Sequence, residues 1–270
     1  MICFPNAKIN LGLRILRKRP DGYHELETIM VPVGFNDVLE AVVSAENSFQ
    51  ASGTGLEGPV AHNLVVKAWE LLGGETHLPP LRVHLHKNIP VQAGLGGGSS
   101  DASFALKLFN GFASPECTRS SLLEMAARIG SDCPFFIDNR PAMVRGRGDL
   151  LEEVDPGLKG YYAGILVPDV SVSTVEAYRH VVPSASGIPL DEAVRKPVEE
   201  WKEHIFNGFE PYFFKKHPGL KRLKTSLYDK GAVFALMSGS GSAFYGIFKE
   251  KPGLSKHFGD LITWEGPLPH

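Results

Sequence analysis

Residues 93–102 read AGLGGGSSDA, the densest glycine cluster in a chain of 270 residues. The cluster follows a segment of alternating apolar and polar residues that ends at Pro90. It precedes a helical pattern of apolar residues that starts near Ser99. Glycines let successive backbone N–H groups turn inward, and the helix behind them offers free N–H donors and the positive end of its dipole. We therefore predict a phosphate cradle rather than a flexible turn. Its expected residues are Gln92, Ala93, Gly94, Leu95, Gly96, Gly97, Gly98, Ser99, Ser100, Asp101 and Ala102.

Two better-known phosphate motifs do not fit this loop. No lysine follows it, so the GxxxxGK[ST] pattern fails, and Ser99 occupies the last glycine position of GxGxxG counted from Gly94. The sequence therefore excludes a P-loop NTPase and a Rossmann dinucleotide enzyme.

Hydrophobic periodicity on both sides of the loop predicts a mixed α+β chain. In 8–16 the alternation places Lys8 and Asn10 on one face of a strand. The predicted strands are 8–16, 26–33, 37–43, 81–86, 161–168, 232–237 and 243–248. The predicted helices are 63–73, 99–109, 119–129, 174–181, 191–204 and 211–229. A Pro- and Gly-rich stretch at 155–160 predicts two domains, 1–155 and 156–270.

Composition limits the partners and the compartment. Lys plus Arg number 28 and Asp plus Glu 30, so the chain lacks the basic surplus of a nucleic-acid binder. Three widely spaced cysteines form no CxxC pair, which favours a reducing compartment. No apolar run approaches the roughly 18 residues of a membrane span, and Lys8 leaves no room for a signal peptide. We expect a cytoplasmic protein with no membrane, nucleic-acid or evident protein partner, and we assign no metal ligands.

Two other segments carry candidate chemistry. IGSDCPFF at 129–136 places Asp132 among apolar residues that limit solvent around its carboxylate, as a general base requires, although a lone Asp there is more often a cap or turn residue. MSGSGSAFYG at 237–246 joins two apolar strands, and a simple hairpin loop explains it as well as a functional loop does.

Together with KINLGLRILRKRPDGYHEL at 8–26, these segments resemble the GHMP kinase superfamily over most of the chain. The KINL start and DGYHEL are similar to the branch whose acceptor is 4-diphosphocytidyl-2-C-methyl-D-erythritol, in the non-mevalonate isoprenoid pathway. The resemblance implies a two-domain α+β fold with a mixed or antiparallel N-terminal sheet, a C-terminal α/β sandwich and an active site between the domains. It also implies transfer of the γ-phosphoryl group of ATP to the 2-hydroxyl of that small-molecule substrate, with Mg²⁺ beside the phosphates.

The same resemblance assigns roles to individual residues. It implies that Lys8 and Asp132 are catalytic. It implies substrate contacts from Asn10 near the erythritol hydroxyls, and from Tyr23, His24, Thr174 and Tyr178 around cytosine. It implies adenine-side contacts from Asn63 and Lys87. Cys133 stands where relatives commonly carry Val, and it would place an oxidisable thiol near the site.

Two alternative functions stay open on the sequence. The first keeps the fold and chemistry but acts on another alcohol, of the homoserine or mevalonate type, which would not need the Tyr23–His24 pair. The second is a nucleotide- or sugar-binding regulator, which has no reason to retain both Lys8 and Asp132. Without the resemblance, Tyr23 and His24 could be turn residues and Tyr178 a core residue of its helix.

Overall fold

The computed structural model describes residues 1–55, 62–170, 173–259 and 261–268. The chain forms two compact units that are discontinuous in sequence. Unit 1 comprises Met1–Ala7, Phe35–Val91 and Gly96–Arg140, and unit 2 comprises Lys8–Gly34, Gln92–Leu95 and Pro141–His270. Residues 8–34 and 92–95 therefore belong with the C-terminal half. The division at residue 155 stays a prediction about functional domains, since the compact units are not sequential.

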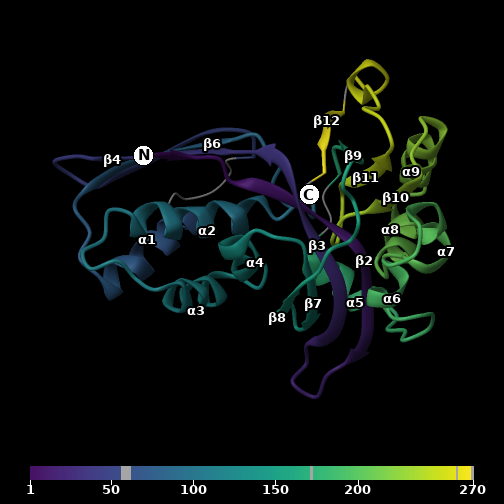
Figure 1. Cartoon of the computed structure of the whole chain (residues 1–270), viewed down its shortest axis with the longest axis horizontal. Coiled ribbons are helices and arrows are strands. Elements are labelled where there is room, and N and C mark those ends of the chain that lie inside the picture. The colour runs from purple at the N-terminus through teal and green to yellow at the C-terminus, as the bar shows by residue number, and fades with distance from the viewer. Residues whose placement is uncertain (56–61, 171–172, 260, 269–270) are drawn as a thin grey trace. The chain divides into compact units, whose positions relative to one another are not determined.

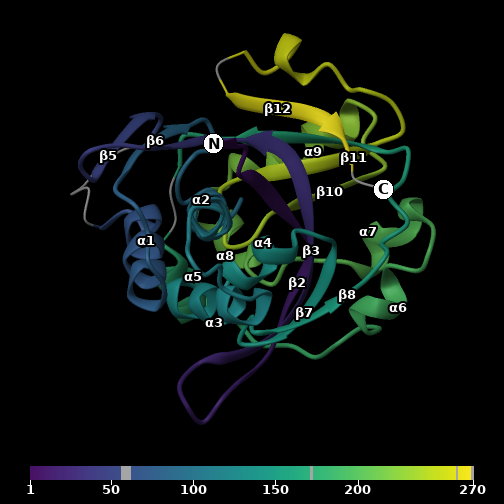
Figure 2. The ribbon, with the colours of Figure 1, turned by 60° about the vertical axis from the view of Figure 1, so that its left-hand side comes forward.

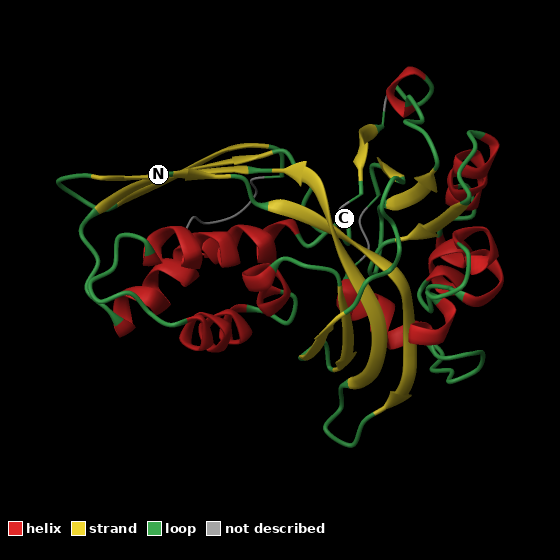
Figure 3. Cartoon of the chain, in the orientation of Figure 1, coloured by secondary structure: helices red, strands yellow, loops and turns green. Residues whose placement is uncertain are grey.

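Unit 1 is a mixed four-stranded sheet with helices packed on it, in the order β1-β4-β6-β5. Among the described strands of this sheet, β5 and β6 pair in parallel, and the other two pairs are antiparallel. The strands are β1 (Ile2–Cys3), β4 (Val38–Val43), β5 (Ser48–Gly53) and β6 (Leu81–Lys87). The helices are α1 (Leu64–Glu75), α2 (Gly97–Asn110), α3 (Arg119–Ile129) and α4 (Cys133–Asp138). They lie along one side of the sheet (Figures 1 and 3), where Val83, Leu106 and Phe109 are part of a fully buried core.

Unit 2 contains two further four-stranded sheets, with orders β2-β3-β7-β8 and β10-β11-β9-β12. The first comprises β2 (Asn6–Lys18), β3 (His24–Asn36), β7 (Ala142–Gly146) and β8 (Leu150–Glu153). The second comprises β9 (Tyr162–Val167), β10 (Phe234–Met237), β11 (Phe244–Phe248) and β12 (Ile262–Pro267). Its helices include α5 (Thr174–His180), α8 (Glu210–Lys216) and α9 (Leu220–Asp229). Figure 2 shows α9 beside the second sheet, against β10 and β11.

The predicted fold class is confirmed, and most predicted elements lie within a few residues of the observed ones. The two longest predicted helices are wrong. The segment 191–204 forms α6 (Leu190–Ala193), a 3₁₀ turn (Val198–Glu200) and α7 (Trp201–His204), because Pro197 has no N–H to continue a helix. The segment 211–229 divides into α8 and α9 at Pro218–Gly219 for the same reason.

Several elements were not predicted from the sequence, and most are short or poor in apolar residues. They are β1, β5, β7, β8, α4 and β12. Strand β5 reads SFQASG, and all four residues of β8 are exposed, so neither carries a clear alternation. In the described part of the chain, no helix has the length and apolar character that crossing a membrane requires.

Candidate active site

The glycine loop leads into α2, an uncapped helix of unit 1. Gly96 is the N-cap of α2 with φ 72°, and no side chain caps the helix. The first backbone bond runs from Ser100 N to Gly96 O at 2.9 Å. The N–H groups of Gly97, Gly98 and Ser99 therefore have no backbone acceptor among the described residues. Three N–H donors at the positive end of a helix dipole are what an anion such as phosphate requires.

Two buried polar atoms next to these donors lack a partner. The Ser100 hydroxyl and one oxygen of Asp101 are buried without a hydrogen bond in the described chain. Buried polar atoms are rarely left unsatisfied, because the cost is about 1 to 3 kcal/mol. The Ser100 hydroxyl oxygen is therefore suited to a phosphate oxygen or to a Mg²⁺ ion carried by it.

The glycines of the loop have different structural roles. A Cβ on Gly97 would lie 2.9 Å from Ile89 Cγ2 and 3.2 Å from Lys87 Nζ, so Gly97 is required for packing. A Cβ on Gly98 would meet only Leu64 Cδ1, at 3.7 Å, and Gly98 is exposed. Gly98 is therefore the position at which a side chain would affect a bound ligand without disturbing unit 1.

Lys87, predicted on the adenine side, lies in a buried charge cluster beneath α2. Its ammonium donates to Asp101 Oδ2 at 2.6 Å and to Asp37, and the exposed fractions of the three side chains are 3%, 4% and 0%. Asp37 also accepts the Asn88 and Ile89 N–H groups at 2.6 and 2.8 Å. Burial raises the pKa of Asp101 to about 8 against the opposing charge of Lys87. The cluster fixes the end of β6 to the second turn of α2.

Asp132 lies in the loop between α3 and α4, half-buried and directly before Cys133. It is the N-cap of α4 by position, but its side chain makes no capping hydrogen bond. Ser103 of α2 donates to Cys133 O at 2.7 Å, which ties this loop to the helix that carries the cradle. The Cys133 side chain is fully buried, and burial raises the pKa of its thiol to about 11. Both features lower the reactivity of this thiol, and its oxidation stays a prediction.

Asn63, the other predicted adenine-side residue, has a visible structural role. It is the N-cap of α1, and its side-chain oxygen accepts the Val65 N–H at 2.9 Å. A capping Asn typically stabilises its helix by about 0.5 to 2 kcal/mol relative to Ala.

In unit 2, Lys8 and Asn10 lie side by side on β2, as the alternation predicted. Lys8 Nζ donates to Asn10 Oδ1 at 2.5 Å, and Asn10 Nδ2 donates to Thr28 Oγ1 on β3 at 3.0 Å. Lys8 N also donates to Leu95 O at 2.9 Å, so residues 92–95 lie against this strand. The exposed fractions of Lys8 and Asn10 are 3% and 2%. The amide oxygen thus holds the ammonium in one orientation.

The serine and glycine loop at 237–242 supports this arrangement. Ser238 Oγ donates to Gly94 O at 2.9 Å and accepts the Asn10 N–H at 3.3 Å. Asn207 Nδ2 donates to Met237 O and Gly239 O, both at 2.8 Å. Sequence reasoning left this loop open between hairpin and function, and Asn207 was missed because a single Asn carries no pattern.

The four predicted cytosine residues all lie in unit 2. The rings of His24 and Tyr178 stack with centroids 5.2 Å apart, and Phe209 meets Tyr178 edge-on at 4.9 Å. Burial lowers the pKa of His24, with help from the charge of Lys18. Tyr23 follows the turn at Asp21–Gly22, is 60% exposed, and has the Arg147 guanidinium 5.2 Å from its ring. Thr174 lies 3.1 Å from Ser240, hydroxyl to hydroxyl.

Comparison with known proteins shows the family of this chain. The model of the GHMP kinases N terminal domain matches residues 63–144, and that of the GHMP kinases C terminal matches 190–255. A 4-diphosphocytidyl-2-C-methyl-D-erythritol kinase of Parabacteroides distasonis is 49% identical, covering 99% of this chain and 100% of the relative. The chain belongs to the GHMP kinase family. The resemblance stated from the sequence is thus confirmed.

Further proteins are similar to this GHMP kinase in sequence or in fold. A protein of the same name from Porphyromonas gingivalis is 42% identical, with 100% of both chains covered. A crystal structure titled 4-(cytidine 5'-diphospho)-2C-methyl-D-erythritol kinase matches with TM-score 0.84 at 30% identity over 100% of both chains. A homoserine kinase from Cytophaga hutchinsonii matches with TM-score 0.63 at 15% identity, covering 98% of this chain and 94% of the other, which shows the fold alone.

The first prediction concerns the cradle. Gly98→Val should raise the KM for ATP at least about tenfold, because a branched side chain would occupy the approach to the α2 N–H groups. Gly74→Val in α1, where a Cβ meets nothing within 4 Å, is the matched control and should leave KM unchanged. Steady-state kinetics measures both. Equal KM values for the two variants would contradict the cradle.

The second prediction concerns the charge cluster. Lys87→Met should reduce the free energy of unfolding by about 3 to 5 kcal/mol, because two buried carboxylates would lose their cation. Lys67→Met, on the exposed side of α1, should cost less than about 1 kcal/mol. Urea denaturation gives both values, and adding Asp101→Asn to Lys87→Met should recover part of the loss. A loss no larger than that of Lys67→Met would show that the cluster does not stabilise unit 1.

Proposed function

We propose that this protein transfers the γ-phosphoryl group of ATP to the 2-hydroxyl of 4-diphosphocytidyl-2-C-methyl-D-erythritol. It is a phosphotransferase of the GHMP kinase family, and relatives covering its whole length carry the corresponding name. The structural observation that supports the proposal best is the uncapped start of α2, with its unpartnered Ser100 hydroxyl. The proposal places the reaction in isoprenoid precursor biosynthesis in the cytoplasm.

ATP phosphates bind the first turn of α2 in this proposal. The N–H groups of Gly97, Gly98 and Ser99 bind the anionic oxygens, and Ser100 is suited to hold the accompanying Mg²⁺. When bound, Mg²⁺ neutralises charge that builds up on the phosphoryl group. Asn63 and Lys87 act indirectly on the adenine side, since each side chain already has partners within unit 1.

Asp132 accepts the proton of the 2-hydroxyl in the proposed reaction. A tertiary hydroxyl is a weak nucleophile at neutral pH, and a carboxylate that takes its proton as the bond to phosphorus forms lowers the barrier. The half-buried position of Asp132, which limits solvent around its carboxylate, supports this role. Lys8 stabilises the negative charge that develops on the same oxygen, and Asn10 keeps the ammonium in place.

Cytosine recognition rests on the aromatic residues of unit 2. His24 and Tyr178 already stack on each other, so they form a flat surface on which a base can lie. The lowered pKa of His24 keeps the imidazole neutral near pH 7, which leaves one ring nitrogen as an acceptor for the base edge. Tyr23 is the exposed ring of this group and could close over the base.

The alternative acceptors have weaker support. The mevalonate and homoserine kinase structures resemble this chain at only 14% and 15% identity, and neither substrate contains a base for the His24–Tyr178 surface. A regulator without chemistry would not require a buried Lys8 oriented by Asn10.

The third prediction separates chemistry from binding. Asp132→Asn should lower kcat by about 10² to 10⁴ while substrate binding is largely kept, because the amide has the size of the carboxylate but cannot accept the proton. Lys8→Met should give a comparable loss, and the double variant far less than the product of the two. Asp138→Asn, at the exposed end of α4, is the control and should retain full kcat. A kcat for Asp132→Asn within a few-fold of the parent value would contradict the role of Asp132 as the base and show that it is only a turn residue.

The fourth prediction concerns specificity. Tyr178→Ala should weaken binding of the cytidyl substrate by about 1 to 3 kcal/mol and leave the KM for ATP unchanged, because only the cytosine would lose its stacking partner. Tyr212→Ala removes a similar stacked pair with His180, 4.4 Å between centroids, and serves as the control. Calorimetry with each ligand measures the effect. Phosphorylation of the free methylerythritol as well as its cytidyl form would contradict base recognition.

A further inference from the structure

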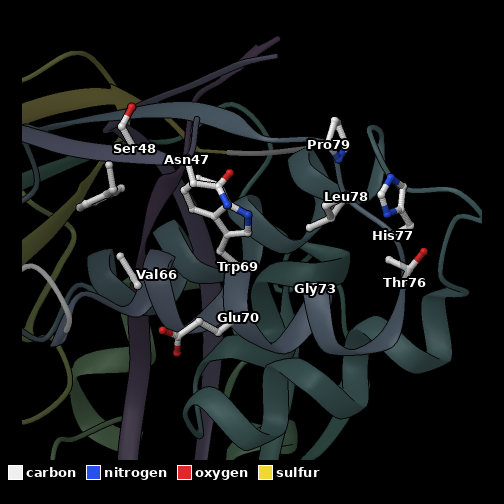
Figure 4. Close-up of a pocket in the computed structure, with 11 residues that line it drawn as sticks. Asn47, Ser48, Val66, Trp69, Glu70, Gly73, Thr76, His77, Leu78 and Pro79 are labelled. Atoms are coloured by element: carbon white, nitrogen blue, oxygen red, sulfur yellow. The ribbon is translucent and has the colours of Figure 1, made fainter. Parts of the chain in front are cut away.

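A cavity of about 540 Å³ lies in unit 1 between α1 and the edge strand β5 (Figure 4). None of its lining residues is among those assigned above to ATP or to the substrate. Its volume is within the range of about 300 to 1,000 Å³ that small-molecule sites occupy. The cavity is therefore large enough to be a binding site in its own right.

The cavity exists because of the way α1 distributes its side chains. Val65, Ala68 and Leu72 are fully buried in the core. A neighbouring face of the helix lines the cavity. Its residues are spaced three and four apart in the sequence, and they are Val66, Trp69, Glu70 and Gly73. Gly73 has no side chain, and a Cβ there would meet only Leu78 Cδ1, at 4.0 Å. The missing side chain at Gly73 leaves room for a ligand.

Aromatic groups form much of the wall. The Trp69 ring contacts the Phe109 ring in the core behind it, with centroids 5.5 Å apart, so the indole is held in position. Phe49 of β5 and Leu78 add further apolar surface. The indole Nε1 makes no hydrogen bond with any described residue. Such a wall favours a flat, largely apolar ligand that offers one or two polar groups.

The charge of the lining selects among such ligands. Among the described residues that line the cavity, Glu70 is the only one with an ionisable side chain apart from His77, and none is a lysine or an arginine. The Glu70 carboxylate has no ion pair or hydrogen bond within the described chain. A phosphorylated or carboxylated ligand would therefore be repelled, and a cationic one attracted.

We propose that this cavity binds a small bicyclic amine, with its ring against Trp69 and its ammonium group paired with the Glu70 carboxylate. The site is separate from the residues assigned to ATP and substrate, and it does not depend on the proposed function. The same charge disfavours an anionic effector such as a nucleotide or an isoprenoid diphosphate.

Three matched probes test the proposal by calorimetry on the full chain. They are 2-aminotetralin, 2-tetralol and tetralin-2-carboxylate, which share a ring system and are cationic, neutral and anionic at pH 7. The amine should bind about two- to fivefold more tightly than the alcohol, as expected for one partly exposed ion pair. The carboxylate should bind more weakly than both.

Two substitutions locate the binding. Gly73→Leu should fill the cavity and weaken binding of 2-aminotetralin at least about tenfold. Gly74→Leu changes helix propensity equally, but it faces open space and should bind like the parent. Glu70→Gln should bring the amine and the alcohol to equal affinity.

The outcomes separate the proposal from its competitors. Binding that survives Gly73→Leu would place the amine elsewhere and overturn the proposal. Preference for the carboxylate, or a preference for the amine that persists in Glu70→Gln, would overturn the assignment of ligand charge. No detectable binding of 2-aminotetralin at millimolar concentration would overturn the site itself.

Discussion

The buried ammonium of Lys87 is the interaction on which unit 1 depends. It joins Asp37, which precedes β4, to Asp101 in the second turn of α2, and Asp37 in turn binds the backbone directly after β6. Three segments that are far apart in sequence are thereby fixed to one nitrogen atom. The cost of burying these charges is high, and it is offset only because they lie in direct contact. The cluster thereby holds the start of α2 in place. The N–H groups of the first turn have no backbone acceptor among the described residues and can therefore bind an anion.

In unit 2, a series of neutral groups links Lys8 to neighbouring strands and loops. Lys8 is held by the amide of Asn10, Asn10 by Thr28 and Ser238, and Ser238 by the carbonyl of Gly94. A neutral acceptor fixes the direction of the ammonium without cancelling its charge. Lys87 differs, because two buried acidic side chains pair with its ammonium, and these partners support a structural role for Lys87.

The sequence was informative where a pattern repeats or where geometry demands a residue type. Alternation placed Lys8 and Asn10 on one face, and the glycine cluster located the start of α2. Pro197 and Pro218 indicate helix breaks in the sequence. The helical spacing of apolar residues on either side of each proline nevertheless led to the prediction of continuous helices. Edge strands such as β5 gave no signal, because their pairing depends on β6 rather than on their own side chains. The partners of Lys87 and the role of Asn207 required long-range contacts that no local pattern records.

A glycine-rich motif therefore does not by itself identify which glycines contact a ligand. Gly94 has φ 78°, and a Cβ there would collide with the Ser238 carbonyl, so this glycine allows two loops of unit 2 to meet. Gly97 makes room for Ile89 and Lys87 inside unit 1. At Gly98, in contrast, the position is exposed and a Cβ would meet only Leu64 Cδ1, at 3.7 Å. Replacing either of the first two would damage packing before it affected phosphate, so loss of activity in such variants says little about binding. Folding therefore requires some glycines of this motif, whereas the proposed binding of phosphate requires another.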